Sequence, residues 1–245
     1  MHMALSLLFW GFVAASSIVL FPLALLLFMV TCFVDPRRWL LHRFTSIWAS
    51  LYTWLNPAWP VQIYGRPQMH ESGPTVIVAN HLSLVDILVL FRLQSHFKWV
   101  SKSENFQVPV IGWNMRLCGY IPIRRGTARS AHTMMKKCDE AISGGSSIMM
   151  FPEGTRSSTG RLRSFKDGAF EIAHRNAVPI QPIVIRGTGD ALPKQGFVLQ
   201  GRHRISIEVL APIPAGEIAE AAPEDMMSRV REIFVEALED NPDSR

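Results

Sequence analysis

A histidine and a carboxylate, His81 and Asp86, stand five residues apart in the segment 80–86, NHLSLVD. Histidine is suited to act as a general base at neutral pH when a partner, usually a carboxylate, fixes its tautomer and aims its free nitrogen. Five residues along an α-helix turn through about 500°, so the two side chains would diverge on one continuous helix. We therefore expect His81 to lie in a turn before the helix that contains Asp86.

The residues on either side of His81 predict that placement. The apolar run Val76–Ala79 precedes it, and Ser83 with Asp86 three residues later forms a Ser-x-x-Asp helix-capping pattern ahead of the apolar residues 87–90. The local prediction is strand, turn and helix. A structural role fits the same pattern, with Asp86 only supporting the cap and His81 only bonding to the backbone, so both roles stay open.

A second polar segment, FPEGTRS, occupies residues 151–157. Glu153 follows a predicted strand, where its carboxylate can contact a substrate or support the loop by accepting backbone N–H bonds, and both roles are open. Arg156 lies where Pro152 and Gly154 restrict the backbone, and a guanidinium held in this way offers a bidentate fork to a phosphate. The rival role for Arg156, and for Arg125 after another strand candidate, is an ion pair with a structural carboxylate.

Short β-rich runs alternate with longer helical ones after residue 60. The strand candidates are residues 61–64, 75–79, 97–100, 120–123, 147–151, 180–185 and 204–210. Helix candidates are residues 84–93, 110–117, 128–142 and 167–176, and a last amphipathic helix is predicted at 224–238. This alternation predicts an α/β fold with a mostly parallel sheet flanked by helices.

The ends of these strand candidates carry the polar residues singled out above. Reactive groups in α/β sheets gather beyond the carboxyl ends of the strands. Here those positions hold His81, Lys102, the pair Arg124 and Arg125, and residues 152–157. We expect one edge of the sheet to carry the His/Asp pair, a glutamate and several cations.

An uncharged apolar stretch opens the chain. Residues 1–34 contain no Asp, Glu, Lys or Arg, and they exceed the roughly 20 residues that cross a bilayer core. No basic segment precedes them, so a cleaved signal peptide is disfavoured, and a membrane anchor is a better interpretation than a buried core helix. Pro22 leaves two forms open, one tilted, kinked span or a helical hairpin in one leaflet.

Arginines and aromatic residues follow this stretch. Arg37, Arg38 and Arg43 are present while no acid occurs between Asp35 and Glu71, which places the rest of the chain on the cytoplasmic side by the positive-inside rule. Four of the seven tryptophans lie in residues 39–59 and predict a helix at the headgroup level, although an aromatic packing helix has the same composition. We expect an anchor with its interfacial helix over 1–59 and a cytoplasmic catalytic domain over 60–245.

Composition excludes several other classes. The net charge of +5 indicates anionic partners, and the apolar anchor favours membrane lipid over nucleic acid, for which no motif is present. The three scattered cysteines argue against a disulfide framework or a cysteine zinc site. The sequence also lacks a Gly-x-Ser-x-Gly elbow, a phosphate-binding P-loop and a His-Glu-x-x-His helix.

Several blocks together resemble the glycerolipid acyltransferase family, specifically its 1-acylglycerol-3-phosphate acyltransferases. Residues 80–86 match the family's His-x4-Asp block, and residues 151–157 match its Phe-Pro-Glu-Gly-Thr-Arg-Ser block at every position. Residues 101–102 and 119–125 resemble its phosphate-contact region, and residues 178–185 its Val-Pro-Ile-x-Pro block. The family often has an acid where Arg124 precedes Arg125, a departure that bears on the acceptor headgroup more than on the reaction.

The resemblance implies an acyltransferase that moves a fatty acyl group from acyl-CoA or acyl carrier protein to the sn-2 hydroxyl of lysophosphatidic acid. The product is phosphatidic acid for phospholipid biosynthesis, with no metal or resident cofactor. His81 is the implied general base and Asp86 its orienting partner. The implied substrate-binding residues are Lys102, Arg125, Glu153, Gly154, Thr155 and Arg156.

Alternative functions stay open. The acceptor can be another lysolipid such as lyso-ornithine lipid, or the same His/Asp pair can act on water in a thioester hydrolase. A non-enzymatic protein that binds anionic lipid is a third possibility. The expected partners are membrane lipids, a lysophospholipid acceptor and the acyl donor, at the inner (cytoplasmic) membrane with the catalytic domain facing the cytoplasm.

Overall fold

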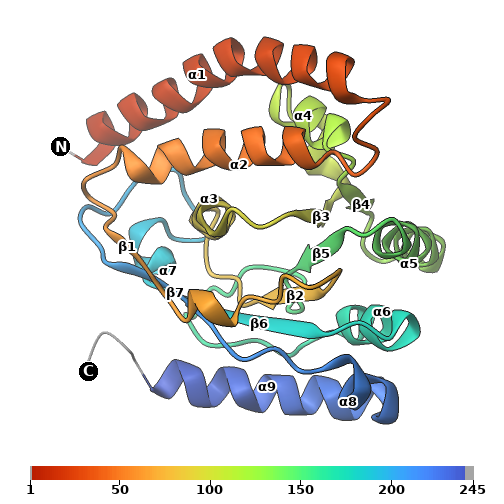
Figure 1. Cartoon of the computed structure of the whole chain (residues 1–245). Coiled ribbons are helices and arrows are strands. Elements are labelled where there is room, and N and C mark those ends of the chain that lie inside the picture. The colour runs from red at the N-terminus through yellow and green to blue at the C-terminus, as the bar shows by residue number, and fades with distance from the viewer. Residues whose placement is uncertain (1, 241–245) are drawn as a thin grey trace.

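A seven-stranded sheet forms the centre of the molecule (Figure 1). The computed structural model describes residues 2–240, and the sheet order is β1-β7-β6-β2-β5-β3-β4. All neighbouring strands run parallel except β6 and β7, which are antiparallel, so the predicted mostly parallel sheet is confirmed. The strands are β1 (Val61–Tyr64), β2 (Val76–Ala79), β3 (Phe97–Lys102), β4 (Ile121–Ile123), β5 (Ser147–Met150), β6 (Ile180–Arg186) and β7 (Ile205–Val209).

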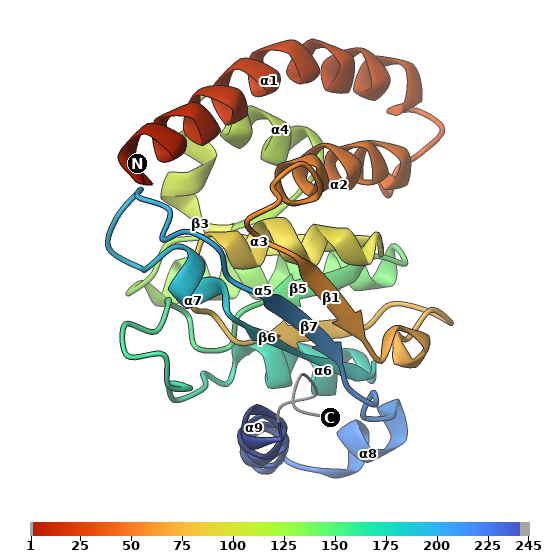
Figure 2. The same ribbon diagram turned by 90° about the vertical axis from the view of Figure 1, so that its left-hand side faces the viewer.

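Two helical layers cover the two faces of the sheet, as Figures 1 and 2 show. One layer contains α1 (His2–Thr31), α2 (Trp39–Trp54), α3 (Val85–Leu90) and α4 (Ile111–Leu117). The other contains α5 (Ala128–Ser143), α6 (Gly168–Asn176), α8 (Ala215–Glu220) and α9 (Pro223–Glu239). Alternate residues of β2 enter the two cores, Ile77 on the side of α2 and Val78 on the side of α6, because successive side chains of a strand point to opposite faces.

Short elements escaped the sequence-based prediction. They are α7 (Thr188–Ala191), α8 and the 3₁₀ helices η1 (Arg66–Gln68) and η3 (Ser103–Gln107). The helix expected over 84–93 is α-helical only to Leu90 and continues as the 3₁₀ helix η2 (Phe91–Leu93). Such segments of one or two turns carry too few apolar repeats for periodicity to identify them.

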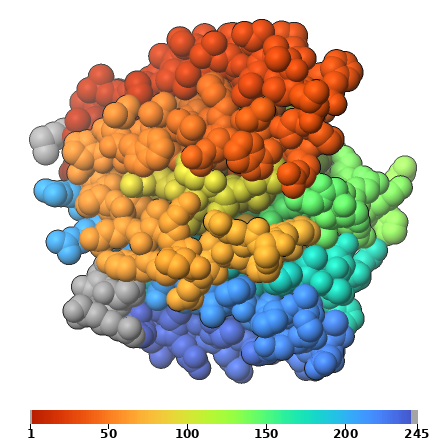
Figure 3. Space-filling model, in the orientation of Figure 1, coloured from red at the N-terminus to blue at the C-terminus, as the bar shows by residue number. Residues whose placement is uncertain are grey.

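The N-terminal stretch is one continuous helix that passes through Pro22. Of the described residues, α1 alone is long and apolar enough to cross a membrane, and only 11% of its most apolar window is buried. It lies along α2, where Ser16 bonds to the Tyr52 hydroxyl, and reaches α4, where Phe21 contacts the Trp113 ring. Figure 3 shows this helix covering one end of the molecule, and its outer surface is apolar.

The second helix, α2, lies between α1 and the sheet rather than at the edge of the molecule (Figure 1). Trp48 and Trp59 are 4% and 1% exposed, so these rings pack in the protein core. Trp39 and Trp54 are about half exposed at the two ends of the helix. The tryptophan-rich segment therefore serves mainly in packing, because α2 contacts α1 on one side and covers the sheet on the other.

Candidate active site

The carboxylate of Asp86 holds His81 at the carboxyl end of β2. His81 lies in the turn after the strand and Asp86 in the first turn of α3, and the imidazole Nδ1 is 2.8 Å from the carboxylate Oδ2. The same Oδ2 accepts backbone N–H bonds from Leu82 at 2.7 Å and Ser83 at 2.8 Å. Asp86 is fully buried. The two roles that the sequence left open for Asp86, capping and orienting, are therefore performed by one oxygen atom.

Two contacts fix the His81 imidazole, a hydrogen bond at its Nδ1 edge and a stacked ring against its face. The bond to Asp86 assigns the Nδ1 proton to that side, and Nε2 makes no hydrogen bond to any residue between 2 and 240. The ring stacks on Phe151, with centroids 3.8 Å apart and planes within 5°. The His81 side chain is 14% exposed, so Nε2 is left as an accessible acceptor of known orientation.

Glu153 supports the turn that carries His81. Its Oε1 accepts the His81 backbone N–H at 2.7 Å, and its Oε2 accepts the Arg163 N–H at 2.9 Å. Burial raises the pKa of the Glu153 carboxyl, and these two N–H groups, which favour the ionised form, offset part of that rise. Both carboxylate oxygens of Glu153, which was predicted to bind substrate, thus accept backbone N–H groups. Of the two roles considered for Glu153, this is support of the loop.

Further bonds tie the same turn to neighbouring segments. The Ser157 N–H donates to the His81 carbonyl at 2.7 Å. The Asn80 amide exchanges two bonds with the backbone of Ile185, donating at 2.9 Å and accepting at 2.7 Å. Ser83 Oγ donates to the Leu192 carbonyl. Sequence reasoning missed the roles of Asn80, Phe151 and Ser157, and the only signal was their position in the two recognised blocks.

The predicted cations gather at the same edge of the sheet. Lys102 ends β3 and pairs with Glu104 at 3.1 Å, while both side chains are exposed. Arg125 follows β4 and is exposed, whereas Arg156 is half-buried and precedes Ser157, whose N–H bonds to the His81 carbonyl. Among the described residues neither Arg125 nor Arg156 has an ion-pair partner, so the rival structural pairing is not seen and both guanidinium groups are available to an anion.

The loop that presents Arg156 needs a glycine. Gly154 has φ of +69°, a conformation that side chains with a Cβ rarely adopt. A Cβ there would also lie 3.0 Å from the Lys166 side chain. Thr155 is half-buried between Gly154 and Arg156. No group of three or more metal-ligating side chains occurs within residues 2–240.

His81, held by the buried Asp86, lies with several cations at the carboxyl edge of the sheet, and comparison with known proteins identifies the family. The model of the acyltransferase family matches residues 60–186, which is about half of the chain. The Chlamydomonas reinhardtii 1-acyl-sn-glycerol-3-phosphate acyltransferase is 35% identical over 89% of this chain and 67% of its own length. The chain therefore belongs to the acyltransferase family.

Other relatives carry the same enzyme name. The chloroplastic 1-acyl-sn-glycerol-3-phosphate acyltransferase LPAT1 of Arabidopsis thaliana is 40% identical over 71% of this chain and 49% of its own length. The chain thus spans about half the length of this relative and of its Brassica napus counterpart. The crystal structure of the Thermotoga maritima acyltransferase PlsC has the same fold, with a TM-score of 0.77, 21% identity and coverage of 98% of this chain and 99% of that one.

Proposed function

We propose that this chain is a 1-acylglycerol-3-phosphate O-acyltransferase. It transfers an acyl group from a thioester to the sn-2 hydroxyl of lysophosphatidate, giving phosphatidate and a free thiol. The observation that carries the proposal is the oriented His81 imidazole with its unbonded Nε2, beside Arg156 at a basic sheet edge. The enzyme names of the relatives support it.

The chemical step uses His81 as general base. Its Nε2 takes the proton of the acceptor hydroxyl as the oxygen attacks the thioester carbonyl, and the buried Asp86 carboxylate stabilises the imidazolium that forms. The tetrahedral intermediate then collapses with cleavage of the C–S bond. The thiolate leaves and takes from His81 the proton that came from the acceptor hydroxyl. The enzyme ends unchanged, and no covalent acyl-enzyme forms.

The cations bind the phosphate of the acceptor. Arg156 offers a planar fork with two parallel N–H donors, the geometry that suits a phosphate. Arg125 and Lys102 contribute charge from neighbouring strand ends. The additional cation Arg124 strengthens the field at this position, and this departure from the family pattern is the specific observation that keeps a different lysolipid headgroup, such as that of a lyso-ornithine lipid, as the second candidate.

The apolar surface of α1 gives the enzyme access to its lipid. Its exposed large residues include Leu8, Ile18, Leu26 and Val30, and burying such a surface in hydrocarbon is favourable. The enzyme thus works at a membrane surface, which we take to be the inner face of a cytoplasmic membrane, and it meets lysolipid there.

The full-length chain in mixed micelles, given a labelled acyl thioester and a panel of lysolipids, tests this function. We expect mass-identified phosphatidate, formed from lysophosphatidate at least tenfold faster than the product from any other acceptor. Faster acylation of lyso-ornithine lipid would change the assigned acceptor and leave the assigned reaction, acyl transfer, in place. Release of free fatty acid at the same rate without any acceptor would instead establish a thioester hydrolase.

A further inference from the structure

An apolar groove lies between the first half of α1, the end of α2 and the loop that precedes β7. It has a volume of about 310 Å³, at the lower end of the usual range for ligand sites. None of the described residues that line it is an Asp, Glu, Lys or Arg, so the groove suits a hydrocarbon chain. Its walls include Leu5, Phe9, Phe12, Leu55, Trp59 and Leu199.

The rim of this groove belongs to the apolar surface of the molecule. Leu5, Phe12 and Leu55 line the groove and are also exposed large apolar residues. The first two lie on α1, whose other exposed residues the proposed function places against the membrane. A chain that belongs to a membrane lipid therefore enters the groove without crossing a polar surface, and its burial there is favourable.

The groove lies at the reactive edge of the sheet. Because β7 is antiparallel to β6 and β1 is parallel to β7, both β1 and β7 begin at the edge where β2 and β6 end. Trp59 in the groove wall lies two residues before β1. Figure 2 shows α7 and the loop before β7 beneath the N-terminal end of α1. Phe151, which stacks on His81, packs in the same core as Phe9 of the groove, so both lie on one side of the sheet.

The loop before β7 joins the wall of the groove to the turn that carries the base. Ser83 Oγ donates to the Leu192 carbonyl at 2.7 Å, and the Gln200 N–H donates to the Ala191 carbonyl at 3.0 Å. Leu192 and Leu199 are buried in the same core, and Leu199 lines the groove. These contacts fix the position of the groove relative to His81.

The order of the strands decides which chain this groove fits. The strands whose ends carry the cations, β5, β3 and β4, lie on one side of β2, and β6, β7 and β1 lie on the other. In lysophosphatidate the free sn-2 hydroxyl lies between the phosphate and the acyl ester. With the hydroxyl at His81 and the phosphate at Arg156, the acyl chain is directed toward β1. The three strand spacings from β2 to β1 amount to about 14 Å, which a long fatty acyl chain spans.

We propose that this groove binds the far end of the sn-1 acyl chain of the lysolipid acceptor. The inference rests on the proposed function and adds a site that selects the acceptor by its chain. A chain too short to reach the groove leaves its walls unfilled and loses the burial of its terminal methylenes. The donor is not held to this path, because its reacting carbonyl stands at the end of its chain and no phosphate fixes the chain's direction.

The variant Leu5→Trp fills the groove from its exposed rim, where Leu5 is 51% exposed. The matched control is Leu7→Trp, because Leu7 is 67% exposed and lies about 200° around the same helix, away from the groove. Both changes keep the surface of α1 apolar. The full-length chain in micelles is assayed with oleoyl- and octanoyl-lysophosphatidate and one donor thioester that supports wild-type turnover.

We expect Leu5→Trp to lose roughly tenfold in kcat/KM for the oleoyl acceptor, which corresponds to about two methylenes of lost burial. Its kcat/KM for the octanoyl acceptor and both values for Leu7→Trp should stay within twofold of wild type. A second series keeps the acceptor constant and varies the chain length of the donor. The proposal is overturned if the loss follows the donor chain, if both acceptors lose equally, or if the control loses as much.

Photo-crosslinking of the wild type locates the chain directly. The probe is lysophosphatidate with a diazirine at the end of its acyl chain, and we expect cross-links within residues 5–12 and 55–59 that an excess of unmodified lysophosphatidate prevents. Cross-links that this excess leaves unchanged would assign the groove to bulk lipid and overturn the proposal. Normal turnover of the probe without cross-links in these residues would also overturn it. Absence of phosphatidate in the wild-type assays would instead contradict the proposed function itself.

Discussion

One carboxylate oxygen of Asp86 accepts three hydrogen bonds. Its Oδ2 accepts from the His81 ring and from the backbone N–H groups of Leu82 and Ser83. Hydrogen bonds to an ionised, buried acceptor are about twice as strong as neutral ones. The tautomer of His81 is thereby set by the same contacts that shape its turn, so the catalytic orientation is part of the local fold.

Replacement of the base should abolish the reaction and leave the fold intact. We expect His81→Ala to lower kcat by roughly 10²–10⁴-fold, the usual contribution of a general base, with an unchanged circular dichroism spectrum. His70→Ala, which removes another partly buried histidine, serves as the control. Turnover close to wild type in purified His81→Ala would exclude the general-base role.

Two arginines of one loop provide a matched pair for phosphate binding. We expect Arg156→Ala to raise the KM for lysophosphatidate by roughly tenfold or more, because it removes a charge-assisted bond, and to change kcat less. Arg161→Ala removes the same charge from an exposed position nearby and should change KM by less than threefold. Equal increases of KM in the two variants would indicate that the loop acts through its overall positive charge and that Arg156 makes no specific contact with the phosphate.

At the scale of elements, buried polar contacts fasten α2 and the α1–α2 connection to the sheet. His42 Nδ1 lies 2.9 Å from the Tyr120 hydroxyl, and its Nε2 lies 2.9 Å from the Ser95 carbonyl. Lys98 donates to the carbonyls of Arg37 and Cys118 at 2.5 and 2.7 Å. These contacts join α2 and the α1–α2 connection to β3 and its surroundings, so the N-terminal helices pack as part of the fold.

The burial of His42 in this contact predicts that the protein loses stability in acid. Burial, together with the nearby charge of His96, lowers the pKa of His42 to about 3. Between about pH 6.5 and that value the unfolded chain binds a proton at His42 that the folded chain does not, so stability falls as pH falls. The slope is on the order of 1 kcal/mol per pH unit.

Thermal unfolding of the wild type and His42→Gln from pH 7 to pH 4.5 measures this slope. We expect the variant to be less stable at pH 7 but to lose less stability on acidification, because it has no imidazole at position 42 to titrate. Parallel curves for the two proteins would show that the acid sensitivity arises at other groups.

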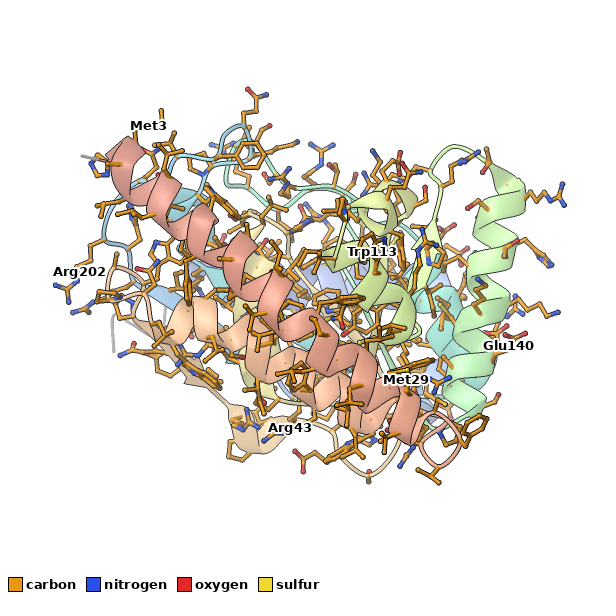
Figure 4. All side chains as sticks on the ribbon, turned by 90° about the horizontal axis from the view of Figure 1, so that it is seen from above. Met3, Met29, Arg43, Trp113, Glu140 and Arg202 are labelled. Carbon is orange, nitrogen blue, oxygen red and sulfur yellow. The ribbon has the colours of Figure 1, made fainter. Side chains whose placement is uncertain are left out.

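At the scale of the whole molecule, both ends of α1 rest on the same α/β domain. Near its start, Ser6 accepts the Leu199 N–H at 2.9 Å and the Trp10 ring N–H donates to the Phe197 carbonyl at 2.7 Å. The connection after its end is held by Lys98. Figure 4 shows Met3 and Met29 at opposite ends of a helix that lies across the domain. We expect such a helix to lie along a membrane surface within one leaflet.

Chemical labelling tests this topology. In a Cys32→Ser background, where Cys118 and Cys138 are buried, we expect Met3→Cys and Val34→Cys to react with an impermeant maleimide from the same side of sealed vesicles. Asp225→Cys on α9 marks the side of the catalytic domain. Reaction of residue 3 from the opposite side only would establish a membrane span.

The sequence by itself determined the local features of this protein. All seven strands, α2 and five later helices (α3, α4, α5, α6 and α9) follow from residue periodicity and turn chemistry, which act over a few positions. It also placed His81 in a turn and Asp86 in the following helix, because the capping pattern is contained in residues 83–86. The apolar character of α1 is likewise evident from composition.

Only the tertiary structure decided how these features meet. The order of the strands, the antiparallel β7, the bonds from Glu153 to the His81 turn and the stacking of Phe151 join residues far apart in sequence. The same holds for the course of α1, whose two ends return to one domain. Periodicity shows which face of an element is buried, but the partner on that face is selected by packing of the whole chain, which no local pattern contains.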